Sequence, residues 1–277
     1  MSVHCTIPAL NTQRDSLSGS AHGKRSIVEA FAFPSFSRKG AERIIAITGA
    51  GGKSTLMYGL AEELSEQGLR VVVTTTTKIY RPDHYTLSTP DSVHSLSQGE
   101  IRVVGDACAE EPAKLSGIGI HHPFSWVTNN ICDVVLVEAD GAREKPLKAP
   151  KPGEPVLPIG CNLVIGVTGW DGLAAPAGPE VIHRWPLFQK LTGQIEGEPV
   201  NDFALIRLLN SSKGLFGEVP NTARVCWLIN KVEDEYDRAE AQIMCQTALQ
   251  YSHRIDTAVI GALQSSDRGL ESIFNRH

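Results

Sequence analysis

The residues best suited to chemistry lie in one short glycine-rich segment, Gly49-Ala50-Gly51-Gly52-Lys53-Ser54-Thr55. Glycines let consecutive backbone N–H groups turn toward one anion, and the N-terminus of a following helix adds about half a positive charge. We expect Lys53 to bridge the β- and γ-phosphates of a nucleotide, Ser54 to bind Mg²⁺ and Thr55 to reach the α-phosphate. This glycine loop (residues 49–55) therefore predicts a binding site for ATP or GTP.

One position departs from the strict phosphate-loop pattern G-x-x-x-x-G-K-[ST]. The pattern places its first glycine where this chain has Ile47. Gly49 supplies a later turn, so we expect a tighter loop. The alternative is a glycine turn that only caps a helix, but the apolar run before the loop and the Lys-Ser-Thr run after it favour phosphate binding.

Two carboxylates follow another apolar run, in Glu138-Ala139-Asp140-Gly141. Carboxylates beside a triphosphate repel it unless a divalent cation lies between them. We therefore expect Glu138 or Asp140 to bind Mg²⁺ and the other to orient an attacking water, with Lys53 as the third catalytic residue. The alternative is a pair of solvated acids in a turn.

Two weaker signals concern the nucleotide. Thr77 and Lys78 end a run of four threonines and could hold Mg²⁺ or an anion, although strand packing alone would explain the threonines. Asn230 and Lys231 begin a segment close to the guanine motif N-K-x-D, with Glu233 at the acidic position. A helix cap explains that segment equally well, so the choice between ATP and GTP stays open.

Residues 145–158 contain five prolines, which exclude a regular helix and a central strand and predict a stiff extended loop. Cations crowd this proline-rich loop, and His183 and Arg184 follow in an irregular region. The residues that we expect to bind an anionic substrate are Arg143, Lys145, Lys148, His183 and Arg184. A solvated basic loop is the alternative.

The elements that must position these residues are strands and helices in alternation. Continuous apolar, β-branched runs predict strands buried on both faces at residues 43–48, 70–75, 101–104, 133–138, 163–168, 225–229 and 257–261. A helix at residues 54–67, closed by Gly68, joins the first two strands and makes their sheet parallel.

We therefore predict an α/β fold with a doubly wound, mostly parallel sheet of the P-loop NTPase type. It forms a single domain over residues 25–277, in which residues 26–33 form a short helix that Pro34 ends. Residues 1–24 lack periodicity and are expected to be a disordered extension.

Composition narrows the class of protein. A net charge of −5 argues against nucleic acid or an anionic membrane as the main ligand. No apolar run approaches the roughly 18 residues of a membrane span. The six cysteines are scattered, which is typical of reduced thiols, so we expect a cytoplasmic protein.

Three segments together resemble the selenium cofactor biosynthesis (YqeC-like) family: AITGAGGKST, VVVTTTTKIY and VLVEADGAREKPLKAPKPGEPVLP. The resemblance extends from Ser26 through Gly261, and the family's loop is also short, so Ile47 is no departure from it. It implies an ATP- or GTP-binding protein that helps to mature the selenium centre of molybdenum hydroxylases. A selenium-dependent molybdenum hydroxylase is the implied partner, although nothing in the residue spacing indicates selenium chemistry.

Three functions remain open from the sequence. The first is a Mg²⁺-dependent nucleoside triphosphatase that acts in cofactor maturation. The second is an ATP-dependent transferase or ligase, because the loop also resembles the ITGTNGKST type of the peptidoglycan-precursor ligases. The third is a nucleotide-dependent scaffold without turnover.

Overall fold

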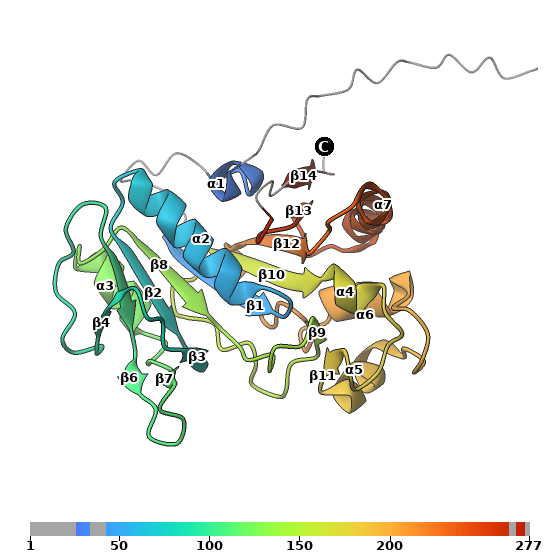
Figure 1. Cartoon of the computed structure of the whole chain (residues 1–277), viewed down its shortest axis with the longest axis horizontal. Helices are drawn as coiled ribbons and strands as arrows, with labels where there is room; N and C mark the ends of the chain where they lie inside the picture. Colours follow the sequence, from blue (N-terminus) through green and yellow to red (C-terminus); the bar gives the residue numbers. More distant parts are fainter. Residues whose placement is uncertain (1–25, 34–42, 266–269, 275–277) are drawn as a thin grey trace, which may run out of the picture.

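The computed structural model describes residues 26–33, 43–265 and 270–274, and its centre is a nine-stranded sheet (Figure 1). In spatial order the strands are β14 (Glu271–Phe274), β13 (Thr257–Gly261), β12 (Arg224–Asn230), β10 (Leu163–Gly169), β1 (Ile44–Gly49), β8 (Val134–Glu138), β2 (Val71–Thr75), β5 (Ile101–Val104) and β4 (Thr86–Ser88). All neighbours are parallel except β13 and β14. The seven predicted strands are confirmed, and the short edge strands β4 and β14 were not predicted.

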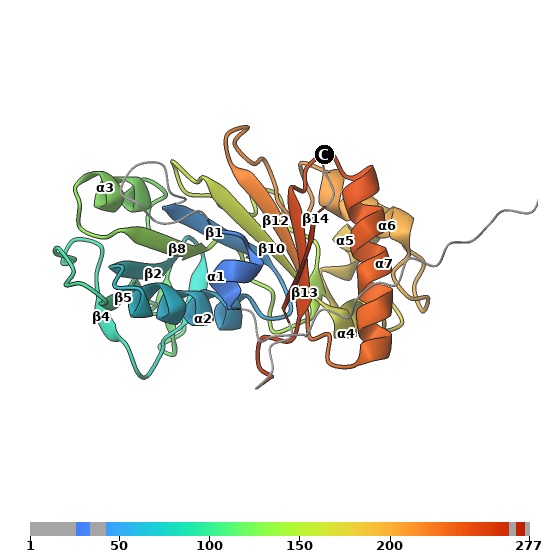
Figure 2. The ribbon, with the colours of Figure 1, turned by 90° about the horizontal axis from the view of Figure 1, so that it is seen from above.

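Helices cover both faces of the sheet, which is why its strands are apolar without alternation. Ile45 and Ile47 of β1 belong to the same core as α1 (Ile27–Ala30) and α2 (Lys53–Glu66). Ala46 belongs to the core on the other face. Figure 2 shows α1 and α2 together on one side of β1. The remaining helices are α3 (His122–Thr128), α4 (Trp170–Leu173), α5 (Trp185–Thr192), α6 (Asp202–Asn210) and α7 (Glu235–Tyr251). This arrangement confirms the α/β class and is consistent with a doubly wound sheet.

The bounds of one predicted helix agree with the structure, and those of the other do not. Helix α2 begins at Lys53 and Gly68 follows its end with φ +83°, as expected. Helix α1 is shorter than the predicted range of 26–33, because Ala32 has φ +48° and ends it after one capped turn. Pro34 and residues 1–24 lie outside the described residues. In the part of the chain that the structure describes, no helix is long and apolar enough to cross a membrane.

The proline-rich loop is not wholly irregular. Its residues form β9 (Leu147–Lys148), which pairs in parallel with β11 (Ile182–His183) outside the main sheet. The prolines therefore exclude a central strand, as predicted, but allow this two-residue pairing. A further small sheet of β3 (Lys78–Tyr80), β7 (Lys114–Ser116) and β6 (Asp106–Ala107) was not predicted.

Parallel strands bring their carboxyl ends to one edge of the sheet, and this edge carries the expected site. Ile47 pairs in register with Glu138, and Glu138 pairs with Thr75 on its other side. Gly169 pairs with Asn230. The glycine loop, both carboxylates and the end of β12 therefore lie along the same edge.

Candidate functional site

The backbone of the glycine loop requires glycine at three positions. Gly49, Gly51 and Gly52 have φ values of +97°, +82° and +131°, which disfavour any residue with a side chain. There is also no room for one, because a Cβ at Gly51 would overlap the backbone of Gly169 and a Cβ at Gly52 would overlap the Asn230 amide. The loop is thus held close to β10 and β12.

The loop presents a row of free amides at the start of α2. The N–H of Gly49 donates to Asp140 and that of Ala50 to the carbonyl of Val167 at 2.9 Å. Among the described residues, the N–H groups of residues 51–55 have no acceptor, and the helical ladder begins with Leu56 N donating to Gly52 O at 2.9 Å. Consecutive free N–H groups at a helix N-terminus form a cradle for an anion.

The Lys53 ammonium lies inside this turn and is buried. Its Nζ donates to Gly49 O at 2.8 Å and lies 3.4 Å from Asp140 Oδ1 and 3.7 Å from Glu138 Oε1. The structure therefore brings together the three residues that the sequence suggested for catalysis. The Lys53 amine and the two carboxylates therefore lie side by side at the loop.

Glu138 faces the start of α2. Ser54 Oγ donates to Glu138 Oε2 at 2.9 Å, so the two expected metal ligands are already neighbours. Burial raises the pKa of Glu138 above its ordinary value of 4.5, against the opposing effect of the Lys53 ammonium. One hydroxyl and one carboxylate suit Mg²⁺, which usually takes a few protein oxygens and fills its shell with water and phosphate oxygens. The described residues hold no cluster of three or more His, Cys, Asp or Glu for a metal.

Asp140 faces inward and is fully buried. Its carboxylate accepts the Gly49 N–H at 3.1 Å and the Thr48 hydroxyl at 3.0 Å, and it lies 2.9 Å from Lys148 Nζ. Burial alone would raise the pKa of Asp140, but the ammonium groups of Lys148 and Lys53 lower it overall. Its oxygens are therefore engaged by donors of the protein, which suits a residue that shapes the loop better than a metal ligand.

Two of the cations expected to bind substrate belong to a buried network. Lys148 Nζ donates to Gly141 O at 2.8 Å and to Glu154 at 3.2 Å. Arg184 also contacts Glu154, at 2.7 and 3.2 Å. Charges of alternating sign thus run from Asp140 through Lys148 and Glu154 to Arg184. The alternative interpretation, in which these cations belong to a solvated basic loop, does not hold for Lys148 and Arg184.

The other three expected substrate residues differ in their surroundings. Lys145 Nζ donates to the carbonyls of Pro179 and Glu180, both at 2.6 Å. Arg143 is exposed with φ +50° and has no hydrogen-bond partner among the described residues. Burial and the nearby charges of Arg184, Lys148 and Arg143 lower the pKa of His183 to about 4. The exposed Arg143 guanidinium is therefore more accessible to a ligand than the paired cations.

The residues near the four threonines and after β12, which we expected to contact the nucleotide, instead contact other groups of the protein. Lys78 Nζ contacts Glu111 at 2.9 Å and Glu110 at 3.2 Å, within the small sheet. The Thr77 N–H donates to the Thr75 hydroxyl at 2.9 Å. Lys231 pairs with Asp171 at 2.6 Å. Each of these groups has a structural partner.

Asn230 braces the glycine loop. Its Nδ2 donates to Gly51 O at 2.8 Å, and its Oδ1 accepts the N–H of Leu263 at 3.0 Å. Both ends of the amide are therefore engaged by the backbone of two other segments. The side chain links the loop to the segment after β13.

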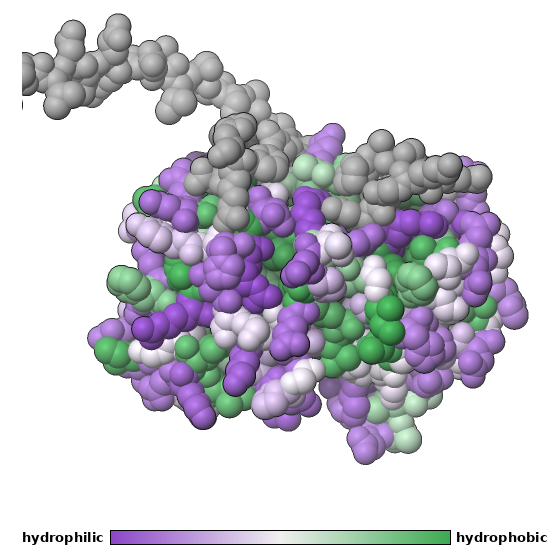
Figure 3. Space-filling view, turned by 180° about the vertical axis from the view of Figure 1, so that it is seen from behind, coloured by the Kyte–Doolittle hydropathy of each residue, from purple (hydrophilic) through white to green (hydrophobic). Residues whose placement is uncertain are grey.

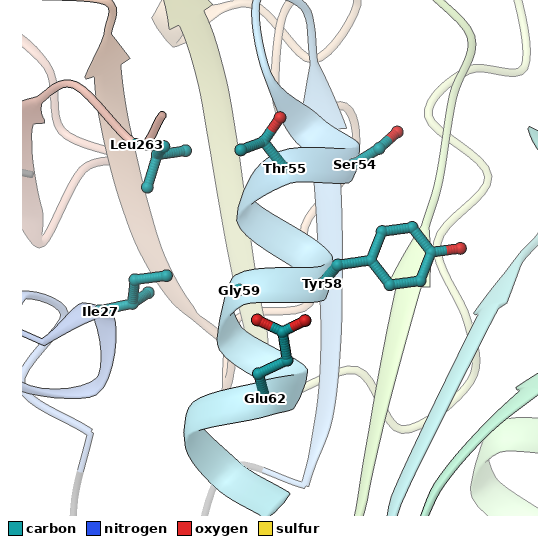
Figure 4. A pocket seen from close by; sticks show the side chains of 7 residues that line it. All are labelled: Ile27, Ser54, Thr55, Tyr58, Gly59, Glu62 and Leu263. Atoms are coloured by element: carbon teal, nitrogen blue, oxygen red, sulfur yellow. The ribbon is translucent and has the colours of Figure 1, made fainter. Parts of the chain in front are cut away.

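No sequence signal predicted the cavity of about 380 Å³ that lies beside the first turns of α2 (Figure 4). Its polar lining comes from Ser54, Thr55 and Glu62, and its apolar lining from Ile27, Tyr58 and Leu263. These residues come from three segments that are far apart in the chain. No spacing pattern within one segment could have predicted that they meet.

Comparison with known proteins adds two findings. The family described as YqeC protein matches residues 45–186. A protein of Escherichia coli (strain K12), described as uncharacterized protein YqeC, is 33% identical over 226 residues, covering 80% of this chain and 88% of that protein. No solved structure matches the chain. The family match spans the glycine loop, both carboxylates and the proline-rich loop.

Proposed function

The chain belongs to the YqeC protein family, and from that premise we propose that it binds a nucleoside triphosphate with Mg²⁺ at the glycine loop and hydrolyses it. The observation that carries the proposal is the row of free N–H groups at residues 51–55, together with the Lys53 ammonium that Gly49 O holds at the same loop. A polyphosphate is the ligand class that matches several backbone donors and one buried cation.

Each residue of the site has a role in this proposal. The loop amides and Lys53 stabilise the charge that develops on the transferred phosphoryl group. Ser54 and Glu138 hold Mg²⁺, which when bound neutralises phosphate charge. Asp140 holds the Gly49 amide and Lys53 in position. Because the pKa of Glu138 is raised, its metal-binding form is gained at a higher pH than for an ordinary glutamate.

Hydrolysis is favoured over transfer to an acceptor by the contacts of the basic residues. Lys145, Lys148 and Arg184 would have to bind an acceptor, yet each of them is engaged within the protein. A role in maturing the selenium centre of a molybdenum hydroxylase is the part of the proposal that rests on the family resemblance. The glycine loop and the residues around it support the nucleotide-binding part of the proposal.

The test is calorimetry and phosphate release with Mg·ATP and Mg·GTP on the parent, Lys53→Ala and Ser54→Ala. Lys53→Ala should weaken binding at least tenfold and abolish phosphate release, because the buried cation is lost. Ser54→Ala should remove most of the Mg²⁺ dependence. Lys190→Ala, which removes an exposed ammonium on α5, is the matched control and should behave as the parent.

The outcomes separate the three functions. Phosphate release without an acceptor supports hydrolysis, whereas release that strictly requires an acceptor indicates a transferase or ligase. Binding without turnover, even beside a molybdenum hydroxylase, indicates a scaffold. If neither triphosphate binds the parent at millimolar concentration, the proposal is wrong.

A further inference from the structure

The cavity beside α2 begins where the phosphate cradle ends. Thr55 contributes the last free amide of the row, and its side chain also lines the cavity. The volume of about 380 Å³ lies within the range of roughly 300–1,000 Å³ that is usual for small-molecule pockets. A ligand whose phosphates occupy the glycine loop would therefore continue into this cavity.

The walls of the cavity suit a flat, partly apolar group. Ile27 and Leu263 lie on one side of α2 and Tyr58 projects from the other, as Figure 4 shows. Gly59 lies one helical turn beyond Thr55 and lets Ile27 approach α2 closely, because a Cβ there would lie 2.9 Å from Ile27 Cδ1. A ribose and a purine base are the groups of a nucleotide that need such walls.

The far end of the cavity carries one carboxylate, Glu62. It lies about 10 Å along the helix axis from Thr55, at roughly 1.5 Å per residue, which is comparable to the length of a ribose and a purine. Its Oε1 accepts the hydroxyl of Tyr85 at 2.7 Å, and Tyr85 stacks on Tyr58 with ring centroids 5.1 Å apart. The Glu62 side chain is exposed, and its Oε2 has no partner among the described residues, so this oxygen is open to a ligand while the Tyr85 hydroxyl holds the other.

We propose that this cavity binds the nucleoside and that Glu62 selects guanine over adenine, an inference that rests on the proposed function. Guanine presents two adjacent N–H donors, N1–H and the 2-amino group. The free Oε2 accepts one of them, and Oε1 accepts the other with the lone pair that the Tyr85 hydroxyl leaves unused. Adenine presents an acceptor at N1, which a carboxylate repels. Asn230 does not compete for this role, since both ends of its amide bind backbone.

The experiment measures the affinities of GTP, ATP, XTP and inorganic tripolyphosphate, each with Mg²⁺, by calorimetry. The parent should bind GTP at least tenfold more tightly than ATP. Glu62→Gln should lose at least tenfold in GTP affinity and gain affinity for XTP, whose 2-oxo group accepts the new amide N–H. Affinity for tripolyphosphate should not change, because it lacks a base.

Glu66→Gln is the matched control, because Glu66 is exposed one turn further along α2 and lies outside the cavity. It should keep the affinities of the parent. Equal affinities for GTP and ATP, or a GTP preference that survives Glu62→Gln, would overturn the inference while tripolyphosphate binding left the phosphate site intact. If tripolyphosphate and all nucleotides fail to bind, the proposed function fails as well.

Discussion

His183 illustrates how the site sets the charge of a single residue. It is half-buried beside three cations, Arg184, Lys148 and Arg143, so the protonated imidazole is disfavoured. A bound polyanion would offset these cations and make protonation easier. The imidazole therefore reports on the electrostatics of the expected substrate region.

The lowered pKa of His183 predicts a stability change with pH. The folded imidazole has a pKa of about 4 and the unfolded one has its ordinary value near 6.5, so the unfolded chain binds more protons between these values. The free energy of unfolding should therefore fall as pH drops from 6.5 to 4. Denaturant titrations of His183→Gln should show a smaller fall. The exposed His94→Gln is the control, and equal slopes for the parent and His183→Gln would contradict the prediction.

At the scale of the elements, the buried ion pairs join segments that the chain keeps apart. Asp140 follows β8, Lys148 lies in β9, and Arg184 precedes α5 and contacts Glu154. The Asp140 carboxylate also holds the glycine loop after β1 through the Gly49 N–H. These ion pairs, with the hydrogen bond to Gly49, therefore connect β8, β9, α5 and the glycine loop.

This network predicts strong coupling between Asp140 and Lys148. Both side chains are fully buried, so Asp140→Asn leaves the Lys148 ammonium with Glu154 as its remaining carboxylate. Removing one partner of a buried pair costs about 3–5 kcal/mol of unfolding free energy. Chemical unfolding of Asp140→Asn, Lys148→Met and the double variant should give a double-mutant loss well below the sum of the single losses.

A matched control comes from an exposed pair. Lys231→Met breaks the contact with Asp171, whose side chain is 48% exposed, and should cost at most about 1 kcal/mol. If the losses at Asp140 and Lys148 simply add, the two residues act independently and the network does not couple the elements.

At the scale of the whole molecule, one continuous nine-stranded sheet joins strands from both ends of the described chain, and two smaller sheets lie outside it. The nine-stranded sheet runs from β14 to β4 with apolar cores on both faces, and β12 and β13 are part of it although the family match ends at residue 186. The face in Figure 3 is largely polar, with smaller apolar groups between the polar ones. Both halves of the chain therefore contribute strands to this sheet and residues to the apolar cores on its two faces.

A shared sheet predicts a single cooperative unfolding transition. Scanning calorimetry should give one peak with equal calorimetric and van't Hoff enthalpies, because no strand can leave the sheet without exposing its neighbours. Saturation with Mg·GTP should move the whole peak, with about 2.7 kcal/mol of stabilisation at a hundredfold excess over Kd. Two separate peaks, of which only one moves, would show that residues 25–277 are not one folding unit.

The sequence by itself determined seven strands of the main sheet, the helix after the glycine loop and the residue types at the sheet edge. Those signals are local, because burial on both faces favours continuous apolar runs and positive φ values favour glycine at positions 49, 51 and 52. The extent of helix α1 and the short strand β9 were misjudged, since a backbone turn at Ala32 and pairing with β11 depend on distant packing.

Only the tertiary structure decided which groups meet. It turned Glu138 toward Ser54 and Asp140 toward Lys148, engaged the Asn230 amide, and placed Leu263 beside α2. The hydrogen bond from Asn230 to Gly51 joins residues 179 positions apart, and its formation depends on how the layers pack. The sequence specifies the type of each side chain, but the group that the side chain contacts depends on the burial and charge of the elements that pack around it.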